Sequence, residues 1–121
     1  MDDPKLSSVS PIFQVSNLQR GIDFYTRVMG FNVGWTWGEP PDRASLCRDA
    51  IEIMLEVERE PRTSHIYLQV NGVDAYFGQV TRDGARVVVP LADREYGMRD
   101  GRISDPDGNH VGLGEAIAGG D

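Results

Sequence analysis

The sequence predicts an α+β domain made of two tandem βαβββ modules, and three observations carry this prediction. The segments 14–18 (QVSNL) and 69–73 (QVNGV) match at an offset of 55 residues. Each begins a helical pattern that ends at a glycine, Gly30 in the first copy and Gly84 in the second. Each helix is followed by β-rich segments that turn residues separate. The 121 residues therefore form one domain, residues 1–121, in which one unit occurs twice.

The first module covers about residues 8–57 and begins with a strand over residues 12–15. A helix follows, with Ser16 or Asn17 as its N-cap, and it ends at Gly30. Its buried stripe has apolar residues spaced by three or four: Leu18, Ile22, Tyr25 and Met29. Three further strands are expected at residues 31–37, 44–48 and 51–57.

The second module covers about residues 64–115 and repeats this order. Its helix is expected at residues 73–82, and its last three strands at residues 85–90, 98–104 and 110–115, the last after the turn DPDG. One helix cannot cover both faces of a four-stranded sheet. The uncovered faces are expected to line a cleft or a subunit interface.

Charge and composition exclude several classes of protein. The net charge of −7 disfavours binding to nucleic acid, and no apolar run approaches the roughly 20 residues that span a bilayer. One cysteine, Cys47, excludes an internal disulfide. We expect a cytoplasmic protein that binds neither nucleic acid nor membranes.

Four segments, taken in order, resemble one family: VSNLQRGIDFYTRVMGF, IEIMLE, HIYLQVNGVDAYF and YGMRDGRISDPDGNHVGLGE. The chain is similar to the glyoxalase, bleomycin-resistance and extradiol-dioxygenase superfamily, also called the vicinal oxygen chelate family, and closest in character to its bleomycin-resistance members. The resemblance implies paired modules whose mixed sheet curls around a cleft, usually completed in a homodimer. It does not fix the function, because this fold carries both enzymes and drug-binding proteins.

Metal-using relatives place one ligand on the first strand and one on the last strand of each module. The matching positions here are Ser10, either Glu52 or Met54, His65 and Gly112. Serine is a poor ligand for a divalent ion and glycine supplies no donor. The resemblance therefore implies an incomplete metal site, and we expect no cofactor.

One alternative metal set remains open. Glu52, His65 and His110 would supply two histidines and a carboxylate, the ligands of many non-haem iron sites, to one divalent metal ion. His65 beside Glu52 would also form an acid–base pair that needs no metal. With this set the chain would be a metal-dependent lyase, isomerase or dioxygenase.

A pocket that only binds needs aromatic walls and a few polar groups. Trp35 and Trp37 are spaced by two, so on a strand they share a face, where they would either stack on a ligand or fill an interface. Carboxylates such as Glu52 beside them would suit a flat cation. Arg102 would border the mouth of the cleft. The candidate ligand-binding residues are Trp35, Trp37, Glu52, Met54, His65, Tyr67, Gln69, Arg102 and His110.

These observations favour a small-molecule-binding protein over an enzyme. We expect a homodimer, with exchanged N-terminal strands as one arrangement, because Pro11 matches a proline of bleomycin-binding relatives near the start of the first strand. Sequestration of a cationic or aromatic drug, and hence antibiotic resistance, is the sharpest form of this hypothesis. The sequence assigns no catalytic residue.

Overall fold

The computed structural model of the chain, which describes residues 3–117, contains two four-stranded sheets with the same internal order. Sheet A has the strand order β1-β4-β3-β2 and sheet B the order β5-β8-β7-β6. The strands are β1 (Ile12–Val15), β2 (Asn32–Gly38), β3 (Pro41–Arg48), β4 (Ile51–Val57), β5 (His65–Gln69), β6 (Arg86–Asp93), β7 (Met98–Ser104) and β8 (His110–Ala116). The helical segments are α1 (Leu18–Asp23), η1 (Phe24–Val28) and α2 (Val73–Arg82). The predicted pair of βαβββ modules is confirmed.

Equivalent residues of the two modules form equivalent pairs in the two sheets. In both sheets the first strand runs parallel to the last strand of its module. Ile12 pairs with Met54 in sheet A, and Tyr67 pairs with Gly112 in sheet B. Because Ile12 and Tyr67 differ by the repeat offset of 55 residues, Met54 and Gly112 occupy equivalent positions.

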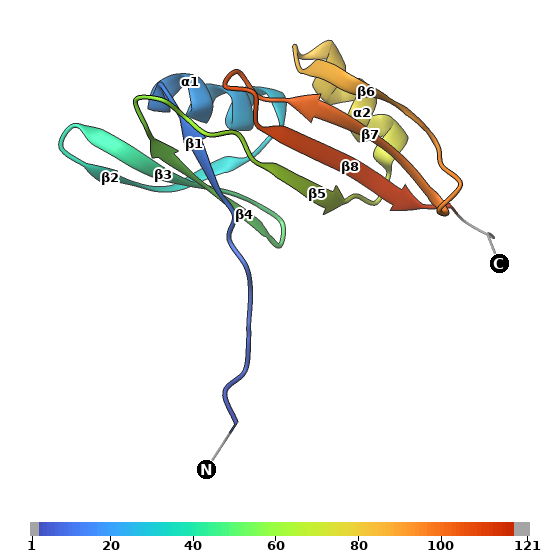
Figure 1. Ribbon diagram of the computed structural model, residues 1–121, viewed down its shortest axis with the longest axis horizontal. Coiled ribbons are helices and arrows are strands. Elements are labelled where there is room, and N and C mark those ends of the chain that lie inside the picture. The colour runs from blue at the N-terminus through green and yellow to red at the C-terminus, as the bar shows by residue number, and fades with distance from the viewer. Residues whose placement is uncertain (1–2, 118–121) are drawn as a thin grey trace.

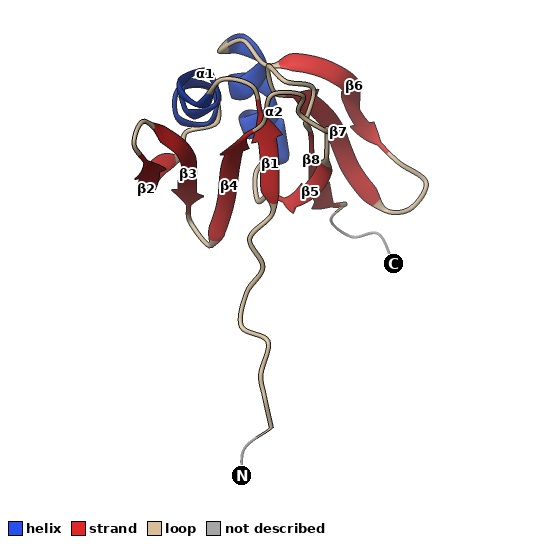
Figure 2. Ribbon diagram, turned by 60° about the vertical axis from the view of Figure 1, so that its left-hand side comes forward, coloured by secondary structure: helices blue, strands red, loops and turns tan. Residues whose placement is uncertain are grey.

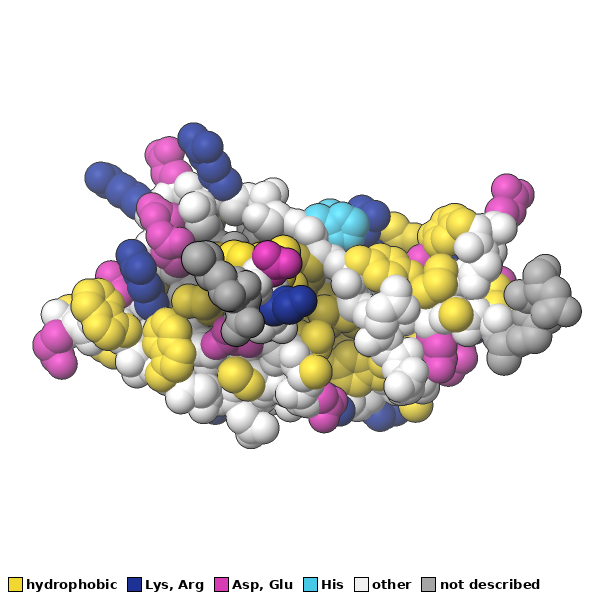
Figure 3. Space-filling view, turned by 90° about the horizontal axis from the view of Figure 1, so that it is seen from below, with side chains coloured by type: hydrophobic (Ala, Val, Ile, Leu, Met, Phe, Trp, Pro, Cys, Tyr) yellow, Lys and Arg dark blue, Asp and Glu magenta, His cyan; other side chains and the backbone are white. Residues whose placement is uncertain are grey.

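Both helices lie on one side of the sheets, and the N-terminal segment leaves on the other (Figures 1 and 2). Apolar side chains on the helix side are fully buried, as Phe13, Leu55 and Leu113 illustrate. The opposite side, called the open face, carries no helix (Figures 1 and 2) and exposes both hydrophobic and charged side chains (Figure 3). Because side chains alternate along a strand, every second side chain faces the core and the others lie on the open face.

The first helix changes its winding at Phe24, where α1 passes into the π-helical η1. It begins as predicted, because the Asn17 side chain accepts a hydrogen bond from Arg20 N at 2.9 Å. The wider π turn lets the consecutive residues Phe24 and Tyr25 both be buried, with their rings edge to face at 5.0 Å. The segment ends at Gly30, whose φ of 78° is left-handed.

The second helix keeps its predicted bounds and is capped from a distant strand. The Glu115 carboxylate accepts hydrogen bonds from the backbone N–H groups of Gly72 and Val73 at the helix start. This negative charge also complements the positive end of the helix dipole. No helix within residues 3–117 is long and apolar enough to cross a membrane.

Two strand boundaries differ from the predicted ones by three residues, and the others agree within one residue. β3 starts at Pro41, not at residue 44, because the chain reverses within residues 39–40 and Gly38 already pairs with Pro41. Proline is tolerated there because it is the first residue of its strand. β6 extends to Asp93, since pairing with β7 continues beyond a bulge after Val89.

The turn after β7 joins the two modules. Its Asp105 is buried, and its carboxylate accepts hydrogen bonds from the Tyr25 hydroxyl, the Asn109 side chain and the backbone N–H groups of Asp107 and Asn109. Asn109 in turn donates to the Gln14 carbonyl at 3.0 Å. A turn of module two is thus anchored in the core of module one.

This junction predicts a large loss of stability for Asp105→Ala. The variant leaves the buried Tyr25 hydroxyl and the Asn109 amide without their acceptor, so we expect the free energy of unfolding to fall by about 3 kcal/mol. Urea denaturation followed by circular dichroism measures it. Asp74→Ala, which removes an exposed ion pair with Arg99, is the control and should cost less than about 1 kcal/mol. Equal losses for the two variants would contradict the junction's role.

Candidate functional site

The open face of sheet A carries both tryptophans. Trp35 pairs with Ser45, which pairs with Met54, so these side chains form one row that continues to Ile12. Trp37 lies in the next row, and the exposed fractions of the two indoles are 42% and 65%. The two rings therefore share a face, as their spacing predicts, and present apolar surface to solvent.

A carboxylate lies one row away from Trp35 on the same face. Glu52 accepts hydrogen bonds from the hydroxyls of Ser10 and Ser45. These bonds lower the pKa of the Glu52 carboxyl and outweigh the opposing effect of burial, so the group is anionic at neutral pH. Cys47 is paired with Glu52 across the ladder and lies 3.5 Å from the Ser45 hydroxyl. Sheet A thus presents a fixed negative charge and exposed aromatic rings on one face.

The open face of sheet B is organised by Tyr67. Its ring lies across Gly112 and Gly114, where an added Cβ would come within 3.0 Å and 1.9 Å of Tyr67 atoms respectively. The Tyr67 hydroxyl donates to the Asp100 carboxylate at 2.9 Å. Tyr96 and Arg94 donate to the same carboxylate, which is buried. The network holds the ring flat over the two glycines.

The histidines lie beside this tyrosine, as neighbours in the β5–β8 ladder. The His65 and His110 rings are 6.2 Å apart and nearly perpendicular. Burial lowers the pKa of His65, and the charges of Arg102 and His110 lower it further. His65 is therefore mostly neutral at pH 7, and Arg102 is the permanent positive charge of this face.

The register identifies the metal-ligand positions that the resemblance left ambiguous. Met54, not Glu52, is the counterpart of Gly112, so the four inherited positions hold serine, methionine, histidine and glycine. Three of these offer a divalent ion no imidazole or carboxylate. Across residues 3–117, no three histidine, cysteine, aspartate or glutamate side chains are grouped closely enough to hold a metal ion. The alternative set is divided within one chain, with Glu52 on sheet A and both histidines on sheet B.

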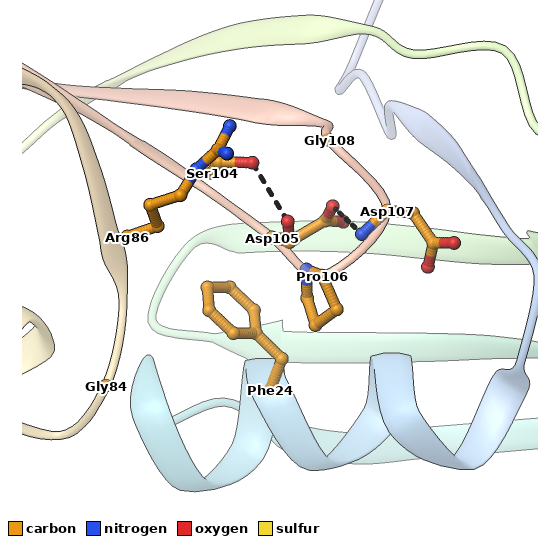
Figure 4. Close-up of a pocket in the computed structure, with 8 residues that line it drawn as sticks. All are labelled: Phe24, Gly84, Arg86, Ser104, Asp105, Pro106, Asp107 and Gly108. Atoms are coloured by element: carbon orange, nitrogen blue, oxygen red, sulfur yellow. Dashed lines mark hydrogen bonds between the residues drawn. The ribbon is translucent and has the colours of Figure 1, made fainter.

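Gln69 and the turn around Asp105 line separate pockets. Gln69, at the end of β5, lines a pocket at the module junction that lies apart from the tryptophans. The second pocket, of about 430 Å³, lies between Phe24, Arg86 and the turn (Figure 4). There the Ser104 hydroxyl donates to the Asp105 carbonyl, and the Asp107 backbone N–H donates to the Asp105 carboxylate. The Asp107 carboxylate points away from Arg86. Its polar groups serve the junction between the modules.

Two important residues of the open face were not among the sequence-based candidates. Ser45 orients Glu52, and Asp100 anchors Tyr67. The hydrogen bond from Ser45 to Glu52 joins neighbouring strands connected by a short turn, so the predicted bounds of β3 and β4 would have been enough to expect it. The Asp100 contact joins residues 33 positions apart and depends on the strand order of sheet B.

The fold agrees with the comparisons to known proteins. The family model of the Glyoxalase/Bleomycin resistance protein/Dioxygenase superfamily matches residues 7–113. The chain belongs to this superfamily. A segment of 52 residues, 43% of the chain, is 42% identical to uncharacterized proteins of Mycobacterium bovis and Mycobacterium tuberculosis. This match spans only about a third of those relatives' length, 34% and 31% respectively.

Two solved structures share the whole fold at low sequence identity. TioX from Micromonospora sp. ML1 superimposes with a TM-score of 0.82 at 22% identity, over 92% of this chain and 99% of that one. The bleomycin-binding protein of Streptomyces verticillus, solved with copper(II)-bleomycin, has a TM-score of 0.76 at 19% identity. That match covers 92% of this chain and 97% of the other. These likenesses establish the fold.

The position of Tyr67 predicts a rescue in a double-mutant cycle. Gly114→Ala should destabilise the protein by about 1–3 kcal/mol, because the new methyl group displaces the Tyr67 hydroxyl from Asp100. In a Tyr67→Ala background the same change should cost nothing, because the space is empty. Urea denaturation of the four proteins measures the coupling. Additive effects would mean that Tyr67 does not lie over Gly114.

Tyr67 also predicts a stability change at high pH. Burial, followed by the hydrogen bond to Asp100 and its charge, raises the pKa of Tyr67 from 10.0 to about 12. The folded state holds the Tyr67 proton more tightly than the unfolded state does. The contribution of the protonated hydroxyl to the free energy of unfolding is therefore complete below pH 10 and is lost as the pH rises through about 12. The stability difference between wild type and Tyr67→Phe should therefore shrink over this range. Urea denaturation at stepped pH values tests it, and a constant difference would contradict the assignment.

Proposed function

We propose that this protein binds a flat, cationic or aromatic small molecule on its open face, without chemical conversion. One observation carries the proposal: the Glu52 carboxylate, fixed by two serines, lies on the same open face of sheet A as the exposed rings of Trp35 and Trp37. Aromatic faces attract cations, and a carboxylate held ionised on the same face adds a charge contact for a ligand that spans the strands between them. No nucleophile is needed for this role.

The proposed site is completed by a second copy of the chain. Sheet A presents Glu52, whereas sheet B presents Arg102 and Tyr67, so the two open faces complement one another in charge. A two-fold dimer that places sheet A of one copy opposite sheet B of the other would create two equivalent clefts. Tyr67, His65 and His110 would then form the wall opposite the tryptophans.

The N-terminal arm supports this assembly. The arm before Ser10 extends away from the sheets on the side of the open face (Figure 2). Leu6 and Val9 on this arm are 102% and 85% exposed, which leaves two apolar side chains without cover in one copy. We propose that the arm packs on the partner subunit, in the exchanged arrangement expected for relatives with a proline at position 11.

Sequestration of an antibiotic-like molecule is the biological role that we propose for this site. The likeness in fold to a bleomycin-binding protein supports it, and sequestration requires affinity alone. A dissociation constant near 1 μM corresponds to about 8 kcal/mol, which requires burial of the ligand's apolar surface in a closed cleft in addition to stacking and one charge contact. Protection would be stoichiometric and would confer resistance only when the protein is abundant.

Tryptophan fluorescence tests the proposed site with metal-free bleomycin and the planar cation proflavine as probes. We expect saturable quenching by at least one of them. Trp37→Ala and Glu52→Gln should each weaken binding about threefold to thirtyfold, the range of one cation–π or charge contact. Glu95→Gln removes an exposed carboxylate outside the site and is the matched control.

Two further measurements decide between this proposal and its rivals. Leu6→Asp together with Val9→Asp should convert a dimer to a monomer in sedimentation velocity and abolish quenching. Elemental analysis of protein purified without a metal-affinity tag should find no stoichiometric metal. One bound metal per chain, or no binding of either probe together with a monomeric wild type, would overturn the proposal.

A further inference from the structure

A second candidate binding site lies where the two modules meet, apart from the open-face site. It is a pocket of about 440 Å³, which falls within the usual range of roughly 300–1,000 Å³ for small-molecule sites. Its walls come from the β3–β4 turn, the start of β4, the end of β5 and α2. The lining residues are Phe31, Arg48, Asp49, Ala50, Ile51, Leu68, Gln69, Val70, Asn71 and Tyr76.

The guanidinium of Arg48 is held in place at this pocket. Its Nη1 donates to the Met29 carbonyl at 2.7 Å, and its central carbon lies over the Tyr76 ring, 4.9 Å from the centroid. The Tyr76 hydroxyl donates to the same carbonyl at 2.6 Å, so the ring and the cation are fixed together. Within residues 3–117 the Nη2 group of Arg48 has no hydrogen-bond partner, and the side chain is 40% exposed. A positive group is therefore fixed, with donors to spare.

A carboxylate stands next to this cation. Asp49 follows Arg48 in the turn, in a left-handed conformation with φ of 51°. Its Oδ2 lies 3.7 Å from Arg48 Nε, a distance at which the charges attract without forming a close hydrogen bond. The Asp49 side chain is 89% exposed. The pocket thus has one positive and one negative group side by side.

The rest of the lining is apolar, with two amides. Phe31 is buried, and Ile51, Leu68 and Val70 are partly buried against the same core. Gln69 and Asn71 add side-chain amides that both donate and accept hydrogen bonds. A ligand with one apolar end and one doubly charged end would match each part of this lining.

We propose that this pocket binds a free apolar α-amino acid in its zwitterionic form. The α-carboxylate pairs with Arg48, the α-ammonium group with Asp49, and the aliphatic or aromatic side chain packs against Ile51, Leu68 and Val70. A simple carboxylic acid would gain the contact with Arg48 but also meet repulsion from Asp49, and a simple amine would meet the reverse, so each loses most of the charge contribution. The site therefore selects for a molecule that carries both charges on one carbon.

Nitrogen-15 heteronuclear NMR with L-phenylalanine as the probe tests this proposal on the full chain. Saturable shifts of the Gln69 and Asn71 amides are expected, with a dissociation constant below about 1 mM, which a ligand of about twelve non-hydrogen atoms can reach. Two analogues each lack one charge, 3-phenylpropionate and phenethylamine, and each should bind at least about tenfold more weakly. An analogue that binds as tightly as L-phenylalanine would overturn the zwitterion assignment.

Variants of the pocket complete the test. Arg48→Gln should weaken L-phenylalanine binding about tenfold, and Asp49→Asn, at an exposed position, about threefold. Leu68→Phe narrows the pocket without altering its charge, so it should also weaken binding. It tests the pocket independently of Arg48→Gln, which also removes the bond to the Met29 carbonyl and could disturb folding. Arg82→Gln, an exposed arginine on α2, is the matched control. Unchanged affinity in all three pocket variants would overturn the proposal, and because the readout lies away from the tryptophans, the open-face site is tested separately.

Discussion

The buried carboxylate of Asp105 is the constraint on which the rest of the structure depends. It accepts four hydrogen bonds, one of them from Tyr25 in the core of the other module. Burial, followed by the negative charge of Asp105, raises the pKa of Tyr25 well above its ordinary value, so its hydroxyl stays protonated and able to donate at physiological pH. Because Asn109 then reaches Gln14 and Ser64, the same turn sets how the two sheets meet. Both the open face and the junction pocket inherit their geometry from it.

A single aromatic side chain explains why module two lacks a ligand at its last strand. Tyr67 occupies the space over Gly112 and Gly114, and any side chain at either position would meet its ring. Asp100 holds the ring there from the next strand but one. The glycine in place of a carboxylate is therefore part of a packed arrangement, with a tyrosine wall where a metal ligand would otherwise project. Such a wall suits a face that contacts a ligand by stacking and hydrogen bonding.

The helices and strands were predictable because the same helix-capping and turn residues occur in both modules, whereas the contacts between these elements were only partly predictable. The bounds of α2 and β7 follow from periodicity and flanking turns, but β3 begins earlier because Pro41 resembles a turn residue yet starts a strand. Period-two alternation correctly placed Trp35 and Trp37 on one face. It left Glu52 and Met54 equivalent, since both share that face, and only the pairing of Ile12 with Met54 separates them. Long-range register, which local patterns do not encode, decides such cases.

The two modules have kept one backbone and diverged in charge at matching positions. Ser10 and Glu52 on sheet A occupy the positions that His65 and His110 occupy on sheet B. Glu52 and His110 lie two residues before the equivalent positions Met54 and Gly112 on the last strand of each module. One module therefore offers a hydrogen-bonded anion, and the other offers a neutral imidazole beside the cation of Arg102. If both faces carried the charge of Glu52, they would repel one another across a two-fold axis. In the proposed dimer, divergence in charge removes this repulsion and would give the cleft two chemically different walls, which is what orientation of an asymmetric ligand requires.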